Sequence, residues 1–101
     1  MKVVFLPAAD QDLSALFLYI QNELQNPIAA RNIATKILQR SQSLEEFPEI
    51  GTSLESVARQ LSGYRHLLVD NYLVIYKVTN SQVIIIRILY ARSDYVQLLR
   101  S

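Results

Sequence analysis

Apolar residues recur with one spacing before residue 47 and with another after residue 63. In the first part they stand three and four residues apart, which is the spacing of an amphipathic helix. In the second part, β-branched and aromatic residues form short runs of the kind found in strands. Because each spacing suits one kind of element, the chain is predicted to have a helical half followed by a sheet half, the pattern of an α+β domain.

The helical half is predicted to contain two helices, one over residues 8–24 and one from Pro27 to near Phe47-Pro48, with a break at Asn26-Pro27 between them. Proline is accommodated in the first turn of a helix and asparagine caps such a turn, so Asn26 is expected to cap the second helix. Each helix has a single apolar face, and the two are therefore expected to pair as a hairpin. The faces comprise Ala9, Leu13, Leu16, Phe17, Ile20 and Leu24 in the first helix and Ala30, Ile33, Ala34, Ile37, Leu38, Ser41 and Leu44 in the second.

The sheet half is predicted to contain three strands, over residues 64–69, 72–78 and 83–90. Asp70-Asn71 and Asn80-Ser81 are two-residue connections of turn-forming type, which indicates two consecutive hairpins. The third of these strands is apolar at both alternating positions, so it is expected to lie inside the sheet with both faces covered.

The remaining segments are shorter. Residues 1–6 predict one more strand, which Pro7 ends, and residues 48–63 are expected to be irregular, with one or two helical turns. Ser93 is expected to cap a last short turn. The predicted fold is a single α+β domain over residues 1–101. A helical hairpin packs on a mostly antiparallel sheet in the order β-α-α-β-β-β, with a short C-terminal tail.

The composition limits the chemistry. The chain has no cysteine and one histidine, His66, so no disulfide, no zinc and no other cofactor is expected, and His66 is interpreted as a surface or packed residue. No apolar run approaches the roughly 20 residues of a membrane span, and the run after Lys2 is too short for a signal peptide, so a cytoplasmic protein is expected. The net charge of +1 is low for a protein that binds phosphates, but the residues after Gly63 are mainly basic and would be the ones to meet a polyanion.

Four segments of the chain form a recognisable pattern. They are a Pro-x-x-Gly bend in Phe47–Gly51, an arginine starting a strand in Gly63–Arg65, a Tyr-x-x-x-Tyr strand in Tyr72–Val78, and an Arg-(x)n-Arg-x-Asp ending in Ile86–Asp94. This pattern resembles the RelE/ParE toxin superfamily, and the resemblance extends over essentially the whole chain. It implies the toxin half of a type II toxin–antitoxin pair, silenced by a partly disordered antitoxin protein.

The superfamily has two activities, and the resemblance leaves both open. RelE-like members cleave mRNA in the ribosomal A site, whereas ParE-like members poison DNA gyrase. Many RelE-like nucleases have Tyr-Arg where this chain has Tyr72-Leu73, and a leucine cannot bind the scissile phosphate or stabilise its developing charge. A ParE-like gyrase inhibitor is therefore favoured. The alternatives are a RelE-like endoribonuclease and a degenerate member that binds antitoxin with little toxicity.

The candidate site residues depend on the activity. In a nuclease, 2′-hydroxyl attack on the adjacent phosphate would proceed without a metal ion, and the candidates are Arg65, Lys77, Arg92 and one of Tyr90 and Tyr95. In either kind of toxin, the candidates for binding the antitoxin or the target are Arg65, Lys77, Arg87 and Arg92. Structural alternatives are a strand-edge charge for Arg65 and an ion pair with Asp94 for Arg92.

The register of the hairpins predicts where these cations lie. With two-residue turns, Arg87 would lie opposite Val74 and share a basic and aromatic face with Arg65, Tyr72 and Tyr76, the tyrosines serving mainly in packing. Two helices are too few to cover all the apolar surface of the strands, so a disordered antitoxin segment is expected to fold over the sheet. Unpaired strand edges would also allow a homodimer.

Overall fold

The computed structural model of the chain describes residues 1–100, with the backbone alone at Arg100, and Ser101 of the predicted domain lies outside the described residues. Its elements are β1 (Lys2–Phe5), α1 (Pro7–Leu18), α2 (Pro27–Gln42), β2 (Thr52–Ser53), β3 (Tyr64–Val69), β4 (Tyr72–Val78), β5 (Gln82–Tyr90) and α3 (Tyr95–Arg100). A π-helical turn, Tyr19–Glu23, extends α1, and 3-10 turns occur at Ser43–Glu45 and Arg59–Leu61. The predicted order of helices and strands is confirmed, and the two-residue strand β2 is an addition that the sequence did not indicate.

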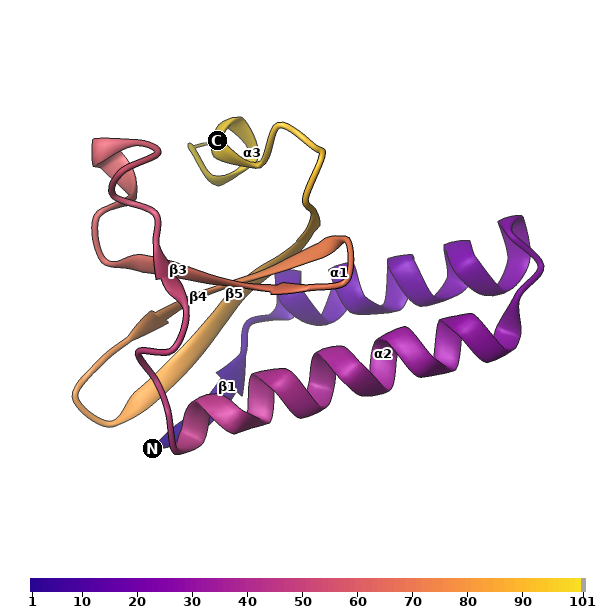
Figure 1. Cartoon of the computed structure of the whole chain (residues 1–101), viewed down its shortest axis with the longest axis horizontal. Coiled ribbons are helices and arrows are strands. Elements are labelled where there is room, and N and C mark those ends of the chain that lie inside the picture. The colour runs from indigo at the N-terminus through magenta and orange to yellow at the C-terminus, as the bar shows by residue number, and fades with distance from the viewer. Residues whose placement is uncertain (101) are drawn as a thin grey trace.

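The strands form one five-stranded sheet in the order β1-β5-β4-β3-β2. β1 pairs with β5 in parallel and the other pairings are antiparallel, so the prediction of a mostly antiparallel sheet is confirmed. Both two-residue turns are present, because Val69 pairs with Tyr72 and the Thr79 amide donates to the Gln82 carbonyl at 2.8 Å. β5 lies between β1 and β4, in agreement with its predicted interior position (Figure 1).

The sheet carries a separate apolar cluster on each face. α1 and α2 pack on one face, while α3 and the segment before β3 lie on the opposite side (Figure 1). On the helical side, strand residues such as Val74, Tyr76 and Ile85 are buried together with Leu16 and Ile37 of the helices. The second cluster contains Leu54, Leu61, Leu73, Ile75 and Leu89, with Tyr95, Val96 and Leu99 packed against it. Each face of the interior strands is therefore covered by a different part of the chain.

The connections of the helices test two sequence predictions. Pro27 is the first residue of α2, and the Asn26 side chain accepts a hydrogen bond from the Ala29 amide at 3.1 Å, so the predicted cap is confirmed. The predicted cap of the last helix is wrong, because α3 begins at Tyr95 and the Ser93 hydroxyl donates instead to the Tyr90 carbonyl at 2.6 Å.

Candidate functional site

A β-bulge in β5 changes where one of the candidate cations lies. The pairing of β4 with β5 follows the predicted register as far as Tyr76, but Ile75 then pairs with Arg87, which makes Ile86 an extra residue. The prediction that Arg87 lies opposite Val74 is therefore wrong, because a bulge shifts the register of every residue beyond it. The guanidinium groups of Arg87 and Arg65 bind different partners, Arg87 the carboxylate of Asp12 and Arg65 the carbonyls of the Pro-x-x-Gly bend.

Asp12 of α1 binds Arg87 and the edge of β5 together. Its carboxylate accepts hydrogen bonds from Arg87 Nε at 2.7 Å and Nη2 at 2.9 Å, and its Oδ2 also accepts one from the Ile88 amide at 2.9 Å. β1 ends at Phe5, which pairs with Ile85, so β1 offers no backbone partner opposite Ile88. The Asp12 carboxylate accepts the hydrogen bond of the Ile88 amide instead. The hydrogen bonds to Asp12 raise the pKa of Arg87. The pair therefore fixes α1 to the sheet.

Arg65 and Tyr76 hold the Pro-x-x-Gly bend. Arg65 Nη1 donates to the carbonyl oxygens of Gly51 at 2.7 Å and Glu49 at 3.3 Å, while the Gly51 amide donates to the hydroxyl of the fully buried Tyr76 at 2.9 Å. A Cβ at Gly51 would overlap that hydroxyl and lie 2.7 Å from the His66 carbonyl oxygen, so only glycine fits. Burial raises the pKa of Tyr76, an effect partly offset by the hydrogen bond from Gly51 and the charge of Arg65. The first three motifs thus meet in one structural contact.

Lys77 lies on the other face of the sheet from Arg65. Arg65 pairs with Tyr76, the residue before Lys77 in β4, and successive residues of a strand point to opposite faces of the sheet. The Lys77 ammonium lies 4.3 Å from the centre of the Tyr64 ring in a cation–π contact. The strand that carries Arg65 also carries His66, whose buried Nδ1 has no hydrogen-bond partner among the described residues. Burial lowers the pKa of His66. Lys77 and Arg65, which lie on opposite faces of the sheet, therefore do not converge on a common point.

The residues after β5 lie at the far end of the sheet from Arg65. Arg65 pairs with Tyr76 while Tyr90 pairs with Tyr72, and these two β4 residues are about 13 Å apart at about 3.3 Å per residue. Arg92 is exposed in the turn that follows, and within residues 1–100 it forms no ion pair with Asp94. The structure thus separates Arg65 from Arg92.

The two candidate tyrosines occupy different surroundings. The Tyr90 ring meets the Tyr72 ring edge to face, with 5.8 Å between their centres, whereas Tyr95 packs against the second apolar cluster. Burial is the largest cause that raises the pKa of Tyr72, and electrostatic interactions with Tyr90 and Tyr19 raise this pKa further. A raised pKa opposes the use of Tyr72 as a base at neutral pH.

Leu73 is 4% exposed within the second apolar cluster. Its neighbours in that cluster include Leu54, Leu61 and Leu89, and Tyr95 and Val96 of α3 pack against them. The position where many RelE-like nucleases have an arginine is therefore enclosed by apolar side chains. A charge placed there would be costly unless a partner compensated it.

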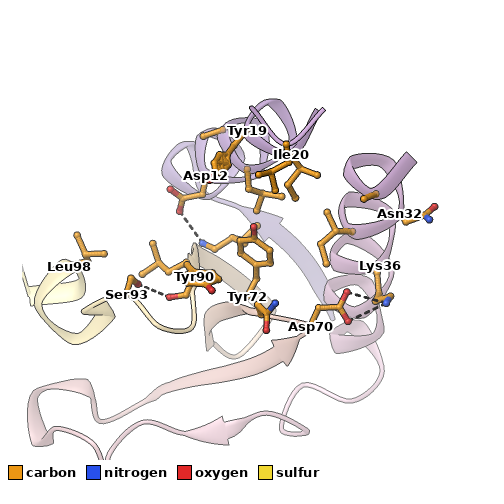
Figure 2. Close-up of a pocket in the computed structure, with 18 residues that line it drawn as sticks. Asp12, Tyr19, Ile20, Asn32, Lys36, Asp70, Tyr72, Tyr90, Ser93 and Leu98 are labelled. Carbon is orange, nitrogen blue, oxygen red and sulfur yellow. Dashed lines mark hydrogen bonds and ion pairs between the residues drawn. The ribbon is translucent and has the colours of Figure 1, made fainter. Parts of the chain in front are cut away.

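The sequence did not indicate a groove of about 960 Å³ between the helical hairpin, the β3–β4 turn and the C-terminal end of β5 (Figure 2). Exposed apolar side chains line it from several elements: Tyr19 is 50% exposed, Leu24 57%, Tyr90 43% and Leu98 42%. Figure 2 shows Tyr72 between the Lys36–Asp70 ion pair on one side and Asp12 on the other. The groove is assembled from residues 12 to 98, so no local sequence pattern could reveal it.

The described residues contain neither a metal-binding cluster of side chains nor a membrane-spanning helix. Across residues 1–100, three or more histidine, aspartate or glutamate side chains do not gather in a way that could hold a metal ion. Among the same residues, the structure contains no helix long and apolar enough to cross a membrane.

A helical hairpin on a five-stranded, mostly antiparallel sheet is the fold of RelE/ParE-like toxins, which confirms the fold predicted from the sequence. The family model described as the ParE toxin of the type II toxin–antitoxin system, parDE, matches residues 3–95. The chain belongs to this family of toxins.

Two solved structures are similar to this chain. One, described as the chromosomal ParDE TA system from P. aeruginosa, has a TM-score of 0.76 and 20% sequence identity, covering 91% of this chain and 97% of that chain. Another, described as a YoeB/ParE toxin from Agrobacterium tumefaciens, has a TM-score of 0.60 and 16% identity, covering 89% of this chain and 98% of that chain. A comparison with curated protein sequences gave no match. At these identities the structures support the shared fold.

Proposed function

We propose that this toxin acts as a ParE-like inhibitor that binds DNA gyrase, and that an antitoxin protein holds it inactive. The observation that carries the choice of target is the burial of Leu73 in the second apolar cluster. A metal-free nuclease depends on cations that stabilise the developing charge at phosphate. Many RelE-like nucleases have an arginine at this position, where this chain has a packed leucine.

The other cations of the nuclease hypothesis support the same choice. Arg65 is bound to two backbone carbonyls, Arg87 to Asp12, and Lys77 lies over the Tyr64 ring. Arg92 is exposed, but it stands at the opposite end of the sheet from Arg65. A reaction at one phosphate requires its cations and its base within hydrogen-bond reach of the same atoms. The described arrangement favours binding over catalysis.

The antitoxin is proposed to occupy the groove. This surface is concave, its exposed side chains include Tyr19, Leu24 and Tyr90, and the Lys36–Asp70 pair lies at its rim. Large exposed apolar surfaces with charged rims are typical of protein-binding sites. A disordered segment that folds as an amphipathic helix would bury these rings and place polar residues towards Lys36 and Asp70.

Purified gyrase tests the proposed target. We expect the chain to inhibit supercoiling of relaxed plasmid DNA and to raise the amount of gyrase-linked broken DNA, and we expect the antitoxin protein to reverse both effects. Unchanged gyrase activity in the presence of a large excess of the chain, together with cleavage of mRNA on purified ribosomes, would instead support the RelE-like nuclease.

A pair of variants tests the groove. Tyr19→Ser combined with Leu24→Ser should weaken antitoxin binding at least tenfold, because tyrosine rings often carry much of the binding free energy of an interface and the exposed Leu24 side chain adds apolar area. Leu18→Ser is the matched control, since Leu18 is 52% exposed but does not line the groove. Equal antitoxin affinities for the two variants would place the antitoxin elsewhere.

A further inference from the structure

The segment between α2 and β2 exposes two large apolar side chains close together. Phe47 is 58% exposed and Ile50 is 59% exposed, and together with Pro48 and Glu49 they line a shallow hollow of about 370 Å³. Residues 47–50 are called the 47–50 loop below. Single exposed apolar residues are common on protein surfaces, but a phenylalanine and an isoleucine beside a proline form a small continuous apolar surface.

The 47–50 loop is held in place by the core. On its C-terminal side, Gly51 is bonded through its amide to Tyr76 and through its carbonyl to Arg65, and Arg65 also binds the Glu49 carbonyl. On its N-terminal side, the Phe47 amide donates to the Ser43 carbonyl at 3.1 Å. Side chains presented from a fixed backbone lose less conformational entropy on binding, which favours their use as anchors.

The surroundings of the 47–50 loop are acidic. Between Arg40 and Arg59 the chain contains four glutamates and neither lysine nor arginine: Glu45, Glu46, Glu49 and Glu55. The Met1 ammonium, which donates to the Glu45 carbonyl, and the Arg65 guanidinium, which donates to the Gly51 carbonyl, keep their positive charges, but the four carboxylates outnumber these two cations. Carboxylates of this kind repel nucleic acid phosphates and favour a protein surface that carries lysine and arginine.

We propose that Phe47 and Ile50 insert into an apolar pocket of the target protein, and that lysine and arginine side chains of the target surround this pocket. The inference rests on the proposed function, because the occupant is the gyrase that the toxin inhibits. The 47–50 loop follows the C-terminal end of α2, whereas α2 lines the groove through Ala29, Asn32 and Lys36, none of which lies in its last turn. The six residues of α2 after Lys36 add about 9 Å, and the groove and the 47–50 loop share no lining residue, so target and antitoxin are proposed to contact different surfaces.

The test combines Phe47→Ser with Ile50→Ser and measures binding to purified DNA gyrase, binding to the antitoxin, and the melting temperature. Both side chains are more than half exposed, so the fold should be retained. We expect gyrase binding to weaken at least tenfold while antitoxin affinity stays within twofold of the unmodified chain. Val57→Ser, which changes a 49% exposed residue outside the loop, is the matched control and should bind gyrase normally.

A second pair of variants tests the charge of the pocket. Glu46→Lys combined with Glu49→Lys should slow association with gyrase at low salt, with a smaller effect at high salt, because rim charges act mainly on the association rate. Glu23→Lys, in the π-helical turn at the other end of α2, is the control and should have little effect. Faster association of the double lysine variant would overturn the proposed basic surroundings of the pocket.

The outcomes separate this inference from the proposed function. If the unmodified chain binds gyrase and the Phe47 and Ile50 variant binds it equally well, the inference is wrong and the proposed function stands. If that variant loses antitoxin affinity as strongly as gyrase affinity, the loop is not a separate target surface and the inference is again overturned. If the unmodified chain does not bind gyrase, both fail together.

Discussion

Replacing Asp12 by alanine removes the carboxylate that holds α1 on β5. The variant would leave the Arg87 guanidinium without its two hydrogen bonds and the Ile88 amide without an acceptor. The Arg87 side chain is 29% exposed and that of Asp12 15%, so the pair is mostly buried but retains some contact with water. Removal of one partner from a fully buried pair costs about 3–5 kcal/mol, and the residual exposure reduces this to about 2–3 kcal/mol.

The expected change in melting temperature follows from the size of the chain. One kcal/mol shifts the melting temperature of a domain of about 100 residues by roughly 4–8 °C, so Asp12→Ala should lower it by about 10–20 °C. Asp12→Asn should be intermediate, because an amide oxygen still accepts from Ile88. Arg87→Met in the Asp12→Ala background should recover part of the loss, since no charge is then left without a partner.

Lys36→Ala is the matched control for this experiment. The Lys36–Asp70 pair also joins a helix to the sheet at 3.2 Å, but its side chains are 51% and 48% exposed. An exposed pair contributes about 0–1 kcal/mol, and alanine suits a helix, so the melting temperature should change by less than about 5 °C. Calorimetry gives the melting temperatures of all these variants. Equal effects of Asp12→Ala and Lys36→Ala would show that the partly buried Asp12–Arg87 pair contributes no more to stability than the exposed Lys36–Asp70 pair.

Three further variants have expected effects on folding. Gly51→Ala should destabilise the chain by about 2–4 kcal/mol in denaturant unfolding, because the added methyl group must displace the buried Tyr76 hydroxyl and break its hydrogen bond; a loss below 1 kcal/mol would contradict the contact. Asn26→Ala should cost about 1 kcal/mol by removing the cap of α2, with an unchanged stability showing that the cap does not contribute. Burial lowers the pKa of His66 in the folded chain, so as the pH falls the unfolded chain binds a proton at a higher pH than the folded chain does. The contribution of neutral His66 to stability is therefore complete above about pH 6.5 and is lost as the pH falls below it. Melting temperatures from pH 7.5 to pH 5 should fall less for His66→Gln than for the unmodified chain, and parallel curves would exclude His66 as a cause.

The elements that could be predicted from the sequence are those with a local signal. Asn26-Pro27 marks a helix start because capping and the fixed proline φ act within one turn. Asp70-Asn71 marks a hairpin for a similar reason, since Asp70 adopts the positive φ of 53° that such turns require. These signals located the helices and strands without knowledge of their packing.

The bulge at Ile86 carried no such signal. It falls in the run Val83–Ile88, where every residue except Arg87 is apolar, and a uniform run looks the same before and after an inserted residue. The partner of Arg87, Asp12, is 75 residues away on another element, so the sequence could not indicate the pair. The position of Arg87 therefore required the structure.

The candidate site was predictable in part. The motif residues Gly51, Arg65 and Tyr76 do come together, but as a contact that holds a bend. The low exposure of Leu73 could be expected from an apolar strand, whereas its enclosure by α3 depends on a tail whose path the sequence did not specify. The groove and the 47–50 loop are surfaces, and exposure of an apolar residue is visible only after the fold is known.

Induced expression of the chain alone, with mRNA 5′ ends and DNA breaks followed in the same culture, distinguishes gyrase poisoning from mRNA cleavage. We expect DNA breaks and an SOS response while mRNA stays intact, and we expect Arg92→Ala to leave the mRNA pattern unaltered. Rapid in-frame cleavage of translated mRNA that is abolished by Arg92→Ala would contradict this expectation. That result would make the toxin a ribosome-dependent nuclease.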